Sequence, residues 1–127
     1  MPSVTTVTNL VASGATLSVD GTALSSSQTL TFNGAAETDG GKFNIAGGAG
    51  ADTITAGTGN DTISGGAGAD VINAGAGDDS VDGGAGDDTI TAGSGADKGF
   101  SGSLLYLNPV LLHLQLVSQH GGQHLNP

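Results

Sequence analysis

The 127-residue sequence contains no cysteine, tryptophan or arginine, and its only lysines are Lys42 and Lys98. The lack of cysteine excludes disulfide bridges and thiolate metal sites. Twelve acidic residues give the chain a formal net charge of −10 at pH 7. Nucleic acid is therefore not an expected partner, because the chain has almost no positive charge with which to neutralise phosphates.

Further absences restrict the function. The only glutamate, Glu37, has no histidine near it in the sequence, so the HExxH signature of zinc proteases is missing, as is the G-x-S-x-G turn of serine hydrolases. His120 and His124 have the spacing of metal ligands on a helix, but the two glycines between them favour a flexible polar tail. The apolar run over 104–117 is interrupted by Pro109 and is too short to cross a bilayer. We expect neither an enzyme nor a membrane span.

Glycine, by contrast, is abundant, and between Gly47 and Asp97 it recurs in a nine-residue unit, Gly/Ala-Gly-x-Gly-x-Asp-x-(Ile/Val)-x. Five full copies are followed by the start of a sixth, and a fixed short period indicates one structural unit stacked on itself. The first position is glycine in odd copies and alanine in even copies, so the true period is eighteen residues. This alternation is expected if odd and even turns lie on opposite edges in different environments, and it could also record duplication of an eighteen-residue segment. The two explanations are compatible.

The residue types of the unit suit a calcium site. Two glycines separated by one residue favour a turn whose backbone enters φ > 0 and leaves carbonyl oxygens unpaired. Calcium takes six to eight oxygen ligands, commonly carboxylates and backbone carbonyls. The aspartate at position six supplies a carboxylate, and the three residues after it predict a minimal strand with its aliphatic side chain on one face.

Stacking such turns places the aspartates in two columns. Strands lie roughly 4.8 Å apart, so one column is expected to hold Asp52, Asp70 and Asp88 and the other Asp61, Asp79 and Asp97. Neighbouring carboxylates repel each other, and no basic residue lies between Gly47 and Asp97 to compensate. We therefore expect bound calcium to supply folding free energy that the small apolar core cannot.

These residues resemble the glycine-rich nonapeptide of the RTX (repeats-in-toxin, haemolysin-type) calcium-binding family, over about two-fifths of the chain. The resemblance implies an all-β, right-handed parallel β-roll (a β-solenoid) with two nonapeptides per turn and Ca²⁺ held between stacked turns. It implies as metal ligands the six aspartates, Asp52, Asp61, Asp70, Asp79, Asp88 and Asp97. It adds the turn carbonyls of Gly48, Gly50, Gly57, Gly59, Gly66, Gly68, Gly75, Gly77, Gly84, Gly86, Gly93 and Gly95.

The resemblance also bears on localisation. Residues 1–10 lack the basic and apolar regions of a cleaved secretory signal. RTX-like proteins typically leave the cell by a type I route with an uncleaved C-terminal signal, so this lack does not count against export. The resemblance thus implies a secreted or extracellular bacterial protein, with the cell surface included, and the type I secretion machinery as a partner.

Three regions are expected along the chain. Residues 1–46 predict a strand-rich cap leading into the solenoid, and residues 47–97 the calcium-binding β-roll. The cap strands are indicated by apolar pairs at Leu17/Val19, Leu30/Phe32 and Phe43/Ile45. Phe43 occupies the position at which a repeat would carry its aspartate, and terminal repeats of a solenoid are typically irregular. The alternative is an unrelated linker rich in threonine and serine.

Residues 98–127 form the third region, an apolar tail containing histidine. Asn108 as N-cap and Pro109 as first helical residue predict a helix over 109–120. The change of composition falls inside the sixth repeat, where Gly99 replaces the aliphatic residue. The tail is therefore either a genuine cap or secretion-signal segment, or a truncated or frame-shifted end without a native role.

The favoured hypothesis is a non-catalytic, secreted calcium-binding module that folds on calcium outside the cell. One alternative is a fragment of a surface-layer or adhesin-like protein whose roll faces bind a protein or a surface. Another is the non-catalytic passenger of a secreted toxin, protease or lipase.

Overall fold

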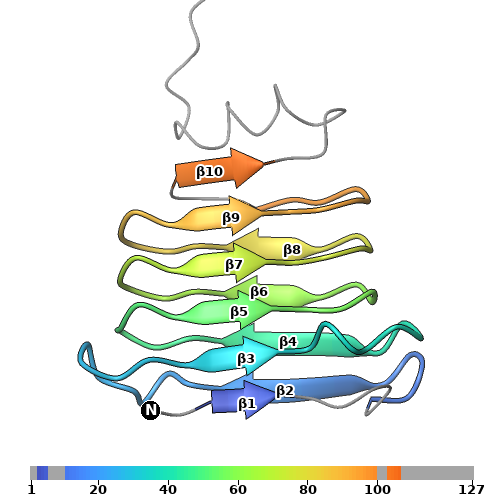
Figure 1. The fold of residues 1–127 in the computed structure, drawn as a ribbon, viewed down its shortest axis with the longest axis horizontal. Coiled ribbons are helices and arrows are strands. Elements are labelled where there is room, and N and C mark those ends of the chain that lie inside the picture. Colours follow the sequence, from blue (N-terminus) through green and yellow to red (C-terminus); the bar gives the residue numbers. More distant parts are fainter. Residues whose placement is uncertain (1–2, 6–10, 100–102, 107–127) are drawn as a thin grey trace, which may run out of the picture.

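The computed structural model describes residues 3–5, 11–99 and 103–106, and every regular element in these ranges is a β-strand. One sheet has six strands in the order β1-β3-β5-β7-β9-β10, and the other has four in the order β2-β4-β6-β8 (Figure 1). The strands of the first sheet are β1 (Ser3–Thr5), β3 (Thr31–Asn33), β5 (Thr53–Thr55), β7 (Val71–Asn73), β9 (Thr89–Thr91) and β10 (Ser103–Tyr106). Those of the second are β2 (Thr16–Asp20), β4 (Lys42–Ala46), β6 (Thr62–Ser64) and β8 (Ser80–Asp82).

The chain alternates between the two sheets from β1 to β9 and rises along the stack, and β10 then follows β9 in the same sheet (Figure 1). All strand pairs are parallel, and within the repeats each residue pairs with the residue eighteen positions later. Thr53 of β5 lies beside Val71 of β7, and Val71 lies beside Thr89 of β9. Two nine-residue units therefore make one turn, and the predicted all-β parallel β-roll is confirmed.

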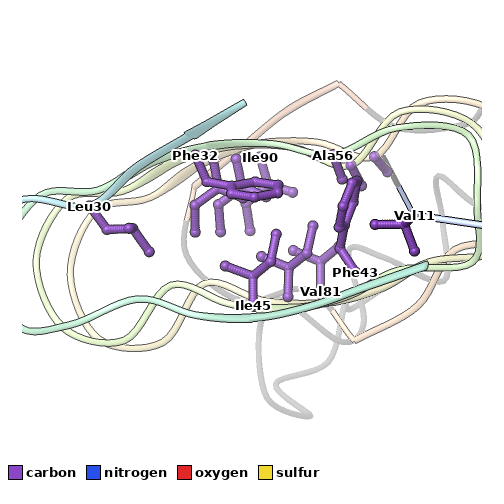
Figure 2. Packing of buried hydrophobic residues seen from close by; sticks show 13 residues of the cluster. Val11, Leu30, Phe32, Phe43, Ile45, Ala56, Val81 and Ile90 are labelled. Atoms are coloured by element: carbon purple, nitrogen blue, oxygen red, sulfur yellow. The ribbon is translucent and has the colours of Figure 1, made fainter. Parts of the chain in front are cut away.

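The space between the sheets is filled by the middle side chain of the three-residue strands β3 and β5 to β9, and by Phe43 and Ile45 of β4, because successive residues of a strand point to opposite faces. Ile54, Ile72 and Ile90 form one row above Phe32, and Ile63 and Val81 form a second row above Ile45. All seven are at most 1% exposed. Figure 2 shows the two rows facing each other across the narrow interior. The single aliphatic position of the repeat is thus sufficient to build a continuous core.

The N-terminal strands enlarge this core. β2, β3 and β4 lie where the apolar pairs predicted strands, and they are joined by longer connections, at 21–30 and 34–41. The rings of Phe32 and Phe43 meet edge to face with centroids 4.9 Å apart, which closes the interior below the first repeats. Val11 and Leu30 lie at opposite ends of the cluster (Figure 2). The largest apolar side chains of the described core therefore belong to the strands that precede the repeats.

At the C-terminal end of the stack, part of the region predicted as an apolar tail adds one more strand. β10 pairs with β9, Ser103 beside Thr89, and adds a strand to the six-stranded sheet. Lys98 forms an isolated parallel bridge with Ser80 above β8. Among the described residues there is no helix, and the helix predicted over 109–120 lies outside them.

Candidate metal centre

The six repeat aspartates form the two columns predicted from the sequence. Each is at most 4% exposed. Each directly precedes a strand of the roll, or in the case of Asp97 the bridge residue Lys98. In both columns Oδ1 of every aspartate accepts a hydrogen bond from the main-chain N–H of the equivalent residue one turn earlier. The donors and acceptors are Leu30 to Asp52, Asp52 to Asp70, Asp70 to Asp88, Phe43 to Asp61, Asp61 to Asp79 and Asp79 to Asp97, at 2.7–2.9 Å.

The two lowest donors show how the columns begin. Leu30 and Phe43 occupy the positions where a repeat would carry aspartate, so each column ends on an apolar residue whose N–H is still used. The sequence predicted this position for Phe43, but not the use of its N–H. It did not predict this position for Leu30, although the order Leu30-Thr31-Phe32 matches Asp52-Thr53-Ile54 in register.

The second carboxylate oxygen divides the aspartates into two groups. Oδ2 of Asp61, Asp70, Asp79, Asp88 and Asp97 is buried and has no hydrogen-bond partner. Asp52 differs, since its Oδ2 accepts a hydrogen bond from the Gly48 N–H at 2.8 Å. A buried, unpaired carboxylate oxygen is costly unless a cation or a donor satisfies it. Five of the six predicted ligands thus present an oxygen that the described protein groups leave unsatisfied.

The turn glycines are required because successive turns touch. A Cβ built at Gly66, Gly75, Gly84 or Gly93 would overlap the carbonyl oxygen of the position-two glycine one turn earlier. The same overlap arises at position four, where a Cβ on Gly77 would meet the Gly59 carbonyl oxygen. Only glycine lets the backbones approach this closely.

The predicted positive φ is present in four of the six copies. In copies three to six both turn glycines lie in the left-handed region, for example Gly66 at φ 98° and Gly68 at 100°. In copies one and two it is absent from Gly48, Gly50, Gly57 and Gly59. These first turns stack on the irregular connections 21–30 and 34–41 instead of on another repeat, so a Cβ there would meet carbonyl oxygens such as those of Gln28 and Glu37.

Several of the turn carbonyl oxygens that the sequence predicted to be unpaired accept a main-chain hydrogen bond. Those of Gly48, Gly57, Gly66 and Gly75 each accept the N–H of the third residue of the next turn, at 2.9–3.2 Å. A carbonyl oxygen has a second lone pair, so this bond leaves one for a metal ion.

The position-one carbonyls were missed by the sequence analysis. A Cβ at Gly65 would overlap Asp70 Oδ2 and would lie 2.8 Å from the carbonyl oxygen of Gly83 in the next turn. This oxygen therefore borders the same small space as the unpaired carboxylate oxygen, and the glycine at the first position of odd copies was the signal for it.

The same contacts explain why the first position alternates. Gly47 and Gly65, on the odd edge, have no room for a Cβ beside the aspartate of their own turn. Ala56, Ala74 and Ala92, on the even edge, are at most 3% exposed and belong to the apolar core. The odd and even edges are therefore physically different environments, which is the first of the two explanations considered for the eighteen-residue period.

Burial raises the pKa values of aspartates in both columns. It raises the pKa of Asp70 to about 6 and that of Asp79 to about 8, despite the hydrogen bonds that each accepts from the turn below. The pKa of Asp61 is likewise raised to about 6 by burial. The Gly57 N–H favours its charged form without reaching hydrogen-bond geometry with Oδ2. Burial also raises the pKa values of Asp88 and Asp97. The metal-free columns resist full ionisation, and a bound cation would remove that resistance.

A second, exposed ladder runs along the even edge. Asn60 Oδ1 accepts the Asp78 N–H, and Asp78 Oδ1 accepts the Ala96 N–H, both at 2.9 Å. The residues of this ladder stand at position five of the nine-residue unit, which the sequence analysis treated as variable. Its negative charge at Asp78 adds to the rise in the pKa of Asp79 and Asp97.

The donor set fits a hard cation held mostly by backbone oxygen. Within residues 11–99, no three acidic or histidine side chains converge on one point. A metal here would thus take one or two carboxylates and complete its shell with carbonyl oxygens, a mixture that calcium accepts and zinc does not.

The family comparison agrees with this geometry. Two overlapping stretches, 44–72 and 64–99, match the model of the RTX calcium-binding nonapeptide repeat (4 copies). The match covers residues 44–99, less than half of the chain. Repeats of this family bind calcium and form a structural module rather than a catalytic one. No curated protein and no solved structure matches the chain.

RTX repeats typically belong to secreted proteins. Among the described residues, no helix has the length and apolar character needed to cross a membrane.

Proposed function

We propose that this protein is a secreted, non-catalytic calcium-binding module whose RTX roll folds when the chain meets extracellular calcium. The observation that carries the proposal is the set of five buried Oδ2 atoms without partners, at Asp61, Asp70, Asp79, Asp88 and Asp97. These oxygens, with the carbonyls of the adjoining glycine turns, would hold the ions. A bound calcium supplies the positive charge that the acidic columns lack.

The described repeats contain no alternative source of positive charge. No lysine or arginine occurs between Gly47 and Asp97, and the exposed acids Asp78, Asp82 and Asp87 add negative charge around the columns. Repulsion of this kind favours the unfolded chain until a cation binds. Metal binding is then coupled to folding, because the site does not exist in the unfolded state.

The calcium concentration at which folding occurs tests the proposal. Extracellular calcium modules bind with dissociation constants of about 10⁻⁴–10⁻³ M, whereas cytosolic buffers bind at about 10⁻⁹–10⁻⁸ M. We expect a folding midpoint, followed by circular dichroism during a calcium titration, in the extracellular range. A midpoint in the range of cytosolic buffers would mean that the roll folds before export and would refute the proposal.

A further inference from the structure

Two buried carboxylates at the N-terminal end of the roll are satisfied by the protein itself. Asp52 is 1% exposed and Glu37 is fully buried. Every oxygen of both groups accepts a main-chain N–H. The five other repeat aspartates each leave Oδ2 unpaired. The contrast falls at the junction between the N-terminal strands and the repeats.

Asp52 lies on the odd edge of the stack. Its Oδ1 accepts the Leu30 N–H at 2.7 Å, and its Oδ2 accepts the Gly48 N–H at 2.8 Å. Gly48 is outside the left-handed region, whereas its counterpart Gly66 has φ 98°. In that later turn Asp70 Oδ2 receives no hydrogen bond. In the first turn the Gly48 N–H therefore meets the oxygen that the later turns leave open.

Glu37 lies on the even edge. Its Oε1 and Oε2 accept the Val11 N–H at 2.9 and 3.0 Å. Its carbonyl oxygen accepts the Thr58 N–H at 3.2 Å, from the turn of the second repeat. Glu37 thus links the chain before β2 to the first even turn of the roll. Asp52 likewise links residues 21–30 to the first odd turn.

We propose that Asp52 and Glu37 are positioning residues that fasten the N-terminal strands to the roll without calcium, and that neither is a calcium ligand. The proposal rests on the calcium-binding function proposed above and divides the acidic residues of that site. Each oxygen of these two carboxylates keeps a second lone pair, but the positive end of the N–H that faces it repels a cation placed beside it, and displacing the N–H would leave a buried donor unpaired. The metal-binding carboxylates then begin at Asp61 on the even edge and at Asp70 on the odd edge.

Counting bound ions separates the two classes. Asp52→Asn and Asp70→Asn remove the same charge from the same column, one turn apart. By native mass spectrometry and calorimetric titration, we expect Asp52→Asn to bind as many calcium ions as the wild type and Asp70→Asn to bind at least one fewer. Loss of an ion from Asp52→Asn would overturn the proposal. A wild-type chain that binds no ion would instead refute the proposed function.

Glu37→Gln is the matched test on the even edge. Glutamine keeps an acceptor for the Val11 N–H but removes the charge, so the calcium count should not change. A decrease would make Glu37 a ligand.

A measurement on the wild type covers the case in which a variant does not fold. In the calcium-saturated, isotope-labelled chain, we expect scalar coupling across the hydrogen bond from the Gly48 nitrogen to the Asp52 carboxylate carbon. No such coupling should join Gly66 to Asp70. Lack of the Gly48–Asp52 coupling in the calcium-bound protein would overturn the proposal.

Discussion

The main-chain N–H of Asp61 donates a 2.8 Å hydrogen bond to Oδ1 of Asp79, the residue eighteen positions later. Every repeat carboxylate except that of Asp52 thereby has two separate tasks, since Oδ1 fastens its turn to the turn below and Oδ2 remains for another partner. An aspartate in this position therefore contributes to the fold as well as to the ion, and substitutions must be designed to separate the two contributions.

Removal of calcium should unfold most of the repeat region. The buried columns have no basic residue to neutralise them, so EGTA should abolish much of the β-signal in circular dichroism, and calcium should restore it. Magnesium should substitute poorly, because it requires tighter octahedral geometry and gives up its water reluctantly. A full β-spectrum in EGTA would contradict this prediction.

Interior and terminal aspartates should differ in their effect on calcium affinity. Asp79→Ala and Asp97→Ala each leave one main-chain N–H without its acceptor, that of Asp61 or Asp79, which costs about 1–3 kcal/mol in both variants. Asp79 has aspartates on both sides in its column, whereas no described aspartate follows Asp97. We therefore expect Asp79→Ala to raise the calcium midpoint more than Asp97→Ala does. Equal shifts in parallel titrations would contradict stacked ions.

The first position of the repeat should tolerate alanine on one edge only. Gly65→Ala places a methyl group against Asp70 Oδ2, whereas the wild type already carries buried alanine at the equivalent even position, Ala74. Gly65→Ala should raise the calcium midpoint and lower stability by roughly 1–3 kcal/mol, as expected for an overpacked interior. Gly14→Ala is a control, because a Cβ at Gly14 meets nothing within 4 Å although φ is 81°. It should cost about 1–2 kcal/mol from the backbone alone and leave the calcium midpoint nearly unchanged.

The pH dependence should have opposite signs with and without calcium. Burial raises the pKa of Asp61 and Asp70 to about 6 and that of Asp79 to about 8 in the metal-free fold, from 3.8 in the unfolded chain. Their stabilising contribution is therefore complete below the unfolded value and is lost as the pH rises through 6 to 8. In EGTA we expect more β-structure at about pH 4 than at about pH 8.

With calcium present the order reverses, because calcium binds the deprotonated carboxylate and protons compete with it. The calcium midpoint should rise as the pH falls below about 8, where Asp79 begins to take up a proton, and more steeply below about 6, where Asp61 and Asp70 do so. Circular dichroism titrations at several pH values measure both trends. A metal-free chain that loses β-structure on acidification would contradict the raised pKa values.

Much of this arrangement was predictable because it follows from a strict period. Residues eighteen positions apart must stack if two units make a turn, so the two aspartate columns and the rows of isoleucine could be assigned before the structure. Phe43 could be aligned with Asp61 for the same reason, by counting back one turn.

The remaining features lie where the period fails. The burial of Glu37 and its bond to Val11 depend on the path of the connection 34–41, which no repeat specifies. The bond from Gly48 to Asp52 depends on a turn conformation that the third copy, with the same glycines, does not adopt. β10 was missed because Ser103–Tyr106 lacks the Gly-x-Gly-x-Asp turn that marks the other late strands.

The eighteen-residue register limits how such a protein can change its length. Insertion of eighteen residues among the repeats returns every later strand to its own sheet and every later aspartate to its own column. Insertion of nine residues moves every later strand to the opposite sheet. β10 would then extend the four-stranded sheet, and Lys98 would pair with the six-stranded sheet. The same shift would bring the buried alanines of one edge to the crowded glycine positions of the other. The roll can therefore lengthen or shorten in evolution only by whole turns, and a change of a single repeat would have to be repaired at both ends.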